Sequence, residues 1–267
     1  MYFSMDEIGY QNNEIIKAID QESDRWKFIY NTARSYGFEG IHITPSLYNK
    51  FGLNLGNIPD YFQDFILTFH LGGGYIAPEN RYEESNKNIE TAFEIAIKHN
   101  MHDISIHPPN HELTEIEKGK SLEFLHKVMS KWLIISVQSG ISLSLETHVA
   151  GEYFLFDGLK EFSEFIDIYP DLGVLIDISH NYYNPKYSED DIIRLLWNKN
   201  IKGLHISDSL RNAEFEEGTH LAIGDGTIDF RKLMKHFNQI PNIFGALEIK
   251  TSNEGLYNSL KYLKTLK

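Results

Sequence analysis

The feature that most constrains the fold is an alternation that recurs along the chain. A short apolar run ends in a polar residue, and a loop and a longer amphipathic stretch follow it. Runs of this kind cover residues 1–4, 40–43, 66–70, 103–107, 141–147, 173–178, 203–207 and 245–249. Helical patterns occupy residues 25–36, 82–99, 115–137 and 256–266. Strands that alternate with helices are typical of repeated βα units that build a parallel sheet.

This pattern predicts an α/β protein in which residues 1–267 form a single (β/α)8 TIM-barrel domain. Barrels of this type commonly run to about 250 residues as one domain. An apolar fraction of 42% is enough for a sizeable core. The alternative is a doubly wound open sheet, but no GxGxxG motif follows the first run to support a dinucleotide-binding fold.

The composition narrows the classes of function. A formal net charge of −13 disfavours a protein whose main task is to grip phosphate backbones, so a nucleic-acid partner is the less favoured reading. The chain has no cysteine, which rules out disulfides and thiolate metal ligands. We find no signal peptide and no apolar stretch of about 18 residues that would span a membrane. We therefore expect a soluble cytoplasmic protein with no membrane partner.

Six of the apolar runs end in a residue that is able to bind a metal ion: His70, His107, Glu146, Asp177, His205 and Glu248. Side chains alternate between the two faces of a strand. Two positions earlier stand mostly small residues, Thr68, Ser105, Ser144, Leu175, Gly203 and Ala246. The positions between are all large and apolar, namely Phe69, Ile106, Leu145, Ile176, Leu204 and Leu247. This parity predicts that the six ends point into the barrel mouth, where active sites of such barrels lie.

Carboxylates and imidazoles that converge at one mouth require a cation, because they otherwise repel or stay unsatisfied. Both groups are ordinary ligands of divalent metals. We predict a metal site made by Glu146, Asp177, His205 and Glu248, with Mn²⁺, Zn²⁺, Co²⁺ or Mg²⁺ as the ion. Further ligands of a second or third ion, or substrate contacts, are expected at His70, His107, His180 and His220.

Each of these residues also has a plainer interpretation. A single histidine at a strand end is more often a hydrogen-bonded structural group than a ligand. Aspartate and glutamate at strand ends often cap the next helix. His42 ends its strand in the same style, and we rank it as a weaker functional candidate. The joint pattern of six ends, rather than any one residue, carries the prediction.

At these residues the sequence resembles the xylose-isomerase-like TIM-barrel superfamily, which contains sugar and sugar-phosphate isomerases and epimerases, related dehydratases, and endonuclease-IV-type AP endonucleases. The segments that carry the resemblance lie between residues 38 and 249: FEGIHI, ILTFH, ISIHPP, LSLETH, LIDISH, GLHISDS, HLAIGDGTIDF and ALEI. No single motif is specific, and their order and spacing together make the match.

The resemblance implies a shared metal site at Glu146, Asp177, His205 and Glu248. In the isomerase and epimerase branch, Glu146 and Glu248 would also be the catalytic acid and base. Arg211 resembles an arginine that contacts the sugar, and His180 resembles a substrate-binding histidine. His70 and His107 are further candidates for substrate contacts. The implied substrate is a small sugar or sugar phosphate, and a homo-oligomer is possible.

The nuclease branch is the alternative that the resemblance leaves open. There, His70 and His107 would join Glu146 around one zinc ion, and His180 and His220 would bind another with an aspartate two residues before the second histidine. Gly218 stands at that position here. Its presence and the acidic charge favour the isomerase, epimerase or dehydratase reading. A metal-binding relative without catalytic activity is the third possibility.

Overall fold

Eight parallel strands close into a barrel in which each strand pairs with the next and the eighth pairs with the first. The computed structural model describes residues 1–6, 13–72, 82–108, 113–148, 154–211 and 213–267. The strands are β1 (Tyr2–Met5), β2 (Gly40–Ile43), β3 (Ile66–Leu71), β4 (Asp103–Ile106), β5 (Ser142–Glu146), β6 (Gly173–Asp177), β7 (Ile201–Ile206) and β8 (Phe244–Leu247). The prediction of a (β/α)8 barrel is confirmed.

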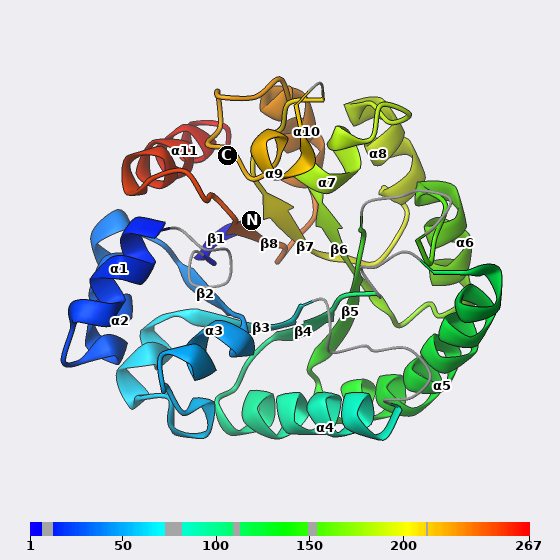
Figure 1. Ribbon diagram of the computed structural model, residues 1–267, viewed down its shortest axis with the longest axis horizontal. Coiled ribbons are helices and arrows are strands. Elements are labelled where there is room, and N and C mark those ends of the chain that lie inside the picture. Colours follow the sequence, from blue (N-terminus) through cyan, green and yellow to red (C-terminus); the bar gives the residue numbers. More distant parts are fainter. Residues whose placement is uncertain (7–12, 73–81, 109–112, 149–153, 212) are drawn as a thin grey trace.

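Helices form a ring outside the strands (Figure 1). They are α1 (Asn13–Gln21), α2 (Arg25–Tyr36), α3 (Pro45–Lys50), α4 (Tyr82–Lys98), α5 (Glu115–Ser139), α6 (Leu159–Ile168), α7 (Ile178–Tyr183), α8 (Glu189–Leu196), α9 (Phe215–Gly218), α10 (Phe230–Phe237) and α11 (Asn253–Thr265). Two 3₁₀ turns, Leu55–Asn57 and Asp60–Asp64, lie between α3 and β3. Within the described part of the chain, no helix combines the length and hydropathy that a bilayer crossing needs.

Local sequence signals set the ends of the best-predicted helices. Asp24 accepts a hydrogen bond from the Lys27 backbone N–H at the start of α2, and Gly37 ends that helix with a φ of 80°. Thr114 and Glu117 form a reciprocal capping box at the start of α5. Such caps satisfy backbone N–H groups that have no partner inside the helix, and glycine adopts a positive φ at little cost.

The expected inward and outward faces of the strands are also confirmed. The residues predicted to face outward all belong to the main core, which lies between the barrel and its helices. They are Phe69, Ile106, Leu145, Ile176, Leu204 and Leu247. Leu175 and Ala246 instead pack with Phe244, beside Tyr2, in a separate small cluster. We call Leu175, Phe244 and Ala246 the interior plug. It fills the barrel on the side of the site away from the mouth.

Gly203 makes room for this plug. A Cβ atom on Gly203 would lie 2.2 Å from the Phe244 ring, closer than any unstrained contact. We expect Gly203→Ala to destabilise the fold by about 1–3 kcal/mol, because the added methyl group overpacks the interior. Gly119, exposed in α5 with nothing within 4 Å of its Cβ position, is the matched control. Gly119→Ala should be neutral or stabilising. Urea unfolding measures both, and equal midpoints for the two variants would contradict the expected crowding.

Candidate metal centre

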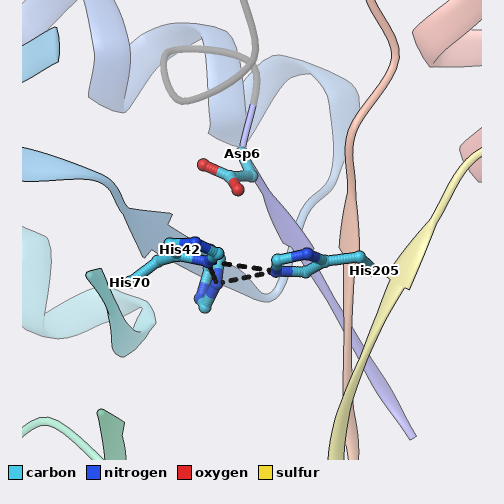
Figure 2. A group of neighbouring side chains, drawn as sticks. All are labelled: Asp6, His42, His70 and His205. Atoms are coloured by element: carbon cyan, nitrogen blue, oxygen red, sulfur yellow. Dashed lines mark hydrogen bonds between the residues drawn. The ribbon is translucent and has the colours of Figure 1, made fainter. Parts of the chain in front are cut away.

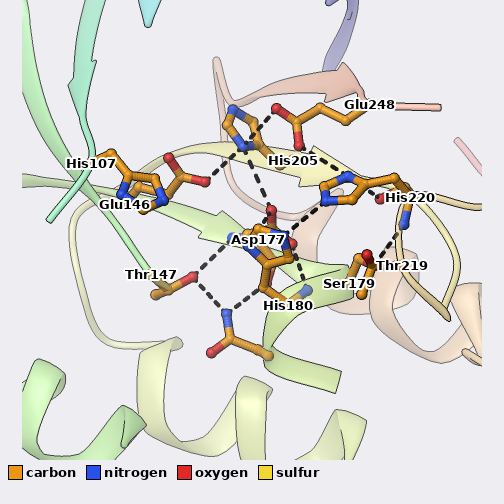
Figure 3. Close-up of polar contacts among 12 residues, drawn as sticks. His107, Glu146, Thr147, Asp177, Ser179, His180, His205, Thr219, His220 and Glu248 are labelled. Atoms are coloured by element: carbon orange, nitrogen blue, oxygen red, sulfur yellow. Dashed lines mark hydrogen bonds and ion pairs between the residues drawn. The ribbon is translucent and has the colours of Figure 1, made fainter. Parts of the chain in front are cut away.

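The four residues predicted as the shared metal site meet at the carboxyl ends of β5, β6, β7 and β8 (Figure 3). All four side chains are buried, with Asp177 fully covered and Glu248 4% exposed. His205 Nδ1 lies 2.9 Å from Glu146 Oε1, 3.1 Å from Glu248 Oε1 and 3.8 Å from Asp177 Oδ2. One ring nitrogen therefore faces three carboxylates from three other strands.

The pKa values of this group reflect several buried carboxylates that face one imidazole ring. Burial raises the pKa of Glu248 well above its ordinary value. Burial alone would lower the pKa of His205, but the facing carboxylates of Glu248 and Glu146 raise it well above its ordinary value. Burial would likewise raise the pKa of Asp177, yet the nearby His180 and His205 lower it. The His205 ring offsets part of the negative charge that a divalent cation would offset fully.

The donor set fits a divalent ion. Glu146 Oε2 and Asp177 Oδ2 are buried and accept no hydrogen bond from any of the described residues. Buried polar atoms normally have a partner, so oxygens aimed into such a group mark a place for a cation. Glu146, Asp177 and His205 offer ligand atoms that all lie within 4.8 Å of one another. Glu248 adds a further carboxylate oxygen, 3.1 Å from His205 Nδ1.

A second group lies against the first and shares Asp177. His180 Nδ1 is 3.3 Å from Asp177 Oδ2, and His180 Nε2 is 2.8 Å from His220 Nε2. His220 Nδ1 in turn lies 3.5 Å from Glu248 Oε2. His220 has a φ of 56°, a left-handed conformation that is uncommon for residues other than glycine and concentrates at functional sites. The predicted candidates His180 and His220 are therefore brought to the metal centre.

The other two predicted histidines are placed differently. His70 Nε2 lies 3.4 Å from Glu146 Oε2, so His70 reaches the edge of the centre. His107 Nδ1 lies 2.5 Å from the carbonyl oxygen of Pro108, and its ring packs against His148 with centroids 4.3 Å apart. His107 stands at the mouth beside the centre, where its role as a ligand or substrate contact stays a prediction.

Arg211 is held by α7 and the segment after it. Its Nε donates to the Tyr182 carbonyl at 3.0 Å, its guanidinium lies 3.9 Å above the Tyr182 ring, and Nη2 donates to the Tyr187 carbonyl. None of these contacts, as far as the structure describes them, joins Arg211 to the strand-end carboxylates. Its predicted contact with a sugar stays a prediction.

Gly218 has a structural role at the position where the nuclease branch has aspartate. A Cβ atom there would lie 2.6 Å from the Leu210 carbonyl oxygen, and the Gly218 carbonyl accepts a hydrogen bond from Leu210 N at 2.7 Å. This pairing adjoins the antiparallel bridge between Asp208 and Leu221. A side chain at residue 218 would therefore displace backbone before it could ligate an ion, which weakens the nuclease reading.

Two more ligand-type residues group with His205: Asp6, which was not predicted, and His42, which was predicted as a weaker candidate. Asp6 follows β1 directly and is 2% exposed, but the predicted run stopped at residue 4. His42 Nε2 lies 3.1 Å from His205 Nε2 although we ranked it as a weaker candidate. Both could have been predicted by the rule used for the other strands, because each is a ligand-type residue at or just after the end of an apolar run.

The chain is thus a TIM barrel that gathers buried carboxylates and imidazoles, able to hold a metal ion, at the carboxyl ends of its strands. The chain belongs to the family described as xylose isomerase-like TIM barrel, whose sequence model matches residues 30–266. A comparison with curated proteins finds no match.

Solved structures with the same fold include three that bear on the site. A D-tagatose 3-epimerase-like protein superposes with a TM-score of 0.74 at 17% identity, covering 100% of this chain and 97% of that one. The IOLI protein with a bound zinc atom gives 0.71 at 14%, covering 99% and 97%. The probable 3-DHS dehydratase AsbF from Bacillus anthracis gives 0.71 at 15%, covering 99% of each chain. At these identities the likeness establishes the fold.

Proposed function

We propose that this protein is a divalent-metal-dependent isomerase or epimerase that acts on a sugar or sugar phosphate. The observation that carries the proposal is the pair of buried glutamates, Glu146 on β5 and Glu248 after β8. Their carboxylates approach His205 Nδ1 from two sides, at 2.9 and 3.1 Å. Two carboxylates on either side of one point suit a reaction that takes a proton from one face of a carbon and returns it on the other.

The metal ligands would be Glu146, Asp177, His205 and Glu248. A divalent ion bound there supplies positive charge to substrate oxygens that gain negative charge when a neighbouring proton leaves. Glu146 would remove the proton from the carbon next to the carbonyl, and Glu248 would deliver a proton to the opposite face. Reversal of the two roles converts the product epimer back.

Residues around the mouth are suited to a sugar. His107 and His180 offer ring nitrogens, and aromatic rings lie beside the histidines. Phe154 packs 5.4 Å from the His148 ring and Phe215 packs 5.3 Å from the His180 ring. Sugars present hydroxyl groups and apolar C–H faces, which such mixed walls accommodate. A related dehydratase is a close variant, because it begins with the same proton removal, and the similarity to AsbF supports keeping it.

Deuterium uptake from solvent tests the proposal. The protein is purified without added metal, its bound metal is identified by elemental analysis, and keto sugars are incubated with it in D₂O. The panel contains ketohexoses, 3-keto-glucosides and 3-dehydroshikimate. We expect deuterium at the carbon next to the carbonyl of at least one compound, dependent on metal. Cleavage of abasic-site DNA in place of any exchange would instead identify a nuclease.

A further inference from the structure

Three imidazole rings, from β2, β3 and β7, converge beside the candidate metal centre. We call His42, His70 and His205 the histidine triangle (Figure 2). His42 Nε2 lies 3.1 Å from His205 Nε2 and 3.3 Å from His70 Nδ1, and the last two nitrogens are 3.3 Å apart. All three side chains are buried.

The size of this triangle matches a metal site. A tetrahedral zinc ion with Zn–N bonds of about 2.0–2.1 Å holds its nitrogen ligands roughly 3.3 Å apart. Three corners at 3.1–3.3 Å leave one point just off their plane at bonding distance from every nitrogen. By contrast, three nitrogens cannot all form straight hydrogen bonds to one another, because each N–H points along its own ring axis.

The contacts on the far side of each ring are compatible with the same tautomer in all three. His42 Nδ1 lies 2.6 Å from Thr68 Oγ1, and His70 Nε2 faces Glu146 Oε2 at 3.4 Å. His205 Nδ1 faces carboxylates of Glu146 and Glu248. When the far nitrogens carry the hydrogens, the near nitrogens present lone pairs to one point. Metal-bound histidines are oriented in this way by carboxylates and hydroxyls on their other nitrogen.

Asp6 supplies a fourth ligand. Its carboxylate lies over the three rings (Figure 2), and its ligand atom and the three nitrogens are all within 4.8 Å of one another. Thr44 Oγ1 donates to Asp6 Oδ1 at 3.3 Å and so holds the carboxylate in this direction. Three imidazoles and one carboxylate are a common donor set for zinc.

We propose that Asp6, His42, His70 and His205 Nε2 form a second divalent-metal site, suited to Zn²⁺ and adjoining the site of the proposed function. His205 is shared: its Nδ1 faces the first site and its Nε2 faces the second. With both sites filled, both ring nitrogens of His205 would be ligands, so the ring would have to release its one N–H proton to solvent. The proposal concerns binding alone and does not require turnover.

Zinc titration of the metal-free protein tests this site. Bound zinc is counted by elemental analysis after desalting. We expect His42→Asn and Asp6→Asn each to bind one equivalent less than wild type. His236→Asn is the matched control, because His236 lies on α10 and belongs to none of the three groups of described residues that could hold an ion. It should bind as much zinc as wild type. An unchanged zinc stoichiometry in His42→Asn would overturn the proposal of a second site. That result would not contradict the metal site of the proposed function.

X-ray absorption on wild-type protein gives a second test that needs no variant. The first site contributes one imidazole and the second contributes three, of which His205 is common to both. The average number of imidazole ligands per zinc should therefore be about two once two equivalents are bound, whichever site fills first. A constant value of one imidazole per zinc would overturn the proposal. It would leave His42 and His70 as groups that only orient His205.

Discussion

Glu146→Gln should lower turnover by about 10³-fold or more, and Glu248→Gln should do the same. Each amide keeps the shape of the side chain but can neither accept nor deliver the proton, and acid–base catalysis of this kind contributes about 10²–10⁴-fold. Each change also removes a charged metal ligand. Steady-state assays of epimerisation under saturating metal measure the effect. Glu164→Gln, an exposed residue on α6 paired only with Lys160 among its described ion pairs, is the matched control and should keep full activity.

Hydrogen exchange separates a loss of proton transfer from a loss of metal. If each glutamate serves one face of the substrate, Glu146→Gln retains deuterium uptake from the epimer that Glu248 deprotonates. Glu248→Gln retains uptake from the other epimer. Loss of exchange from both epimers in both variants, with metal content unchanged, would contradict the assignment of one base to each face.

Removal of the metal should lower the melting temperature by about 10 °C. An ion present at about 1,000 times its dissociation constant stabilises the folded state by about 4 kcal/mol, and each kcal/mol corresponds to roughly 2–4 °C for a chain of this size. The physical reason is the burial of Glu146, Asp177 and Glu248 around one point, where their charges repel without a cation.

Thermal unfolding with and without chelator measures this shift. Asp177→Asn is the comparison variant, because it removes one of the facing charges and one of the ligands. Its melting temperature should respond much less to chelator than that of wild type. Equal melting temperatures of wild-type protein with and without the chelator would show that Glu146, Asp177, His205 and Glu248 do not bind an ion tightly.

The predicted positions of the strand-end residues are confirmed, because strand geometry alone determines them. Alternation of side chains fixes which residues face the barrel interior, and parallel pairing brings successive strand ends to one rim. Glu146, Asp177, His205 and Glu248 were therefore placed correctly from spacing alone. Their proton-transfer and ligand roles remain predictions, since geometry places a side chain and chemistry must be measured.

Other features depend on ring orientation and on loop paths, which spacing does not encode. The contact between His42 and His205 joins residues far apart in sequence. It depends on how each ring is oriented inside the barrel, which residue spacing does not predict. Arg211 lies six residues after His205, but the loop turns its guanidinium onto Tyr182. Asp177 has the capping role weighed for it, since its Oδ1 accepts from His180 N at 2.7 Å at the start of α7. Its Oδ2 faces His205, and its role as a ligand stays a prediction.

The interior plug packs against the histidine triangle from inside the barrel. Leu175, Phe244 and Ala246 are at most 1% exposed, and the Phe244 ring lies 5.1 Å from the ring of His42. An ion bound at the histidine triangle would therefore exchange with solvent from the mouth side, where Glu146 and Glu248 lie. If the proposed outer site were filled at the same time, the outer ion would have to leave before the inner one could, so the inner ion would exchange more slowly.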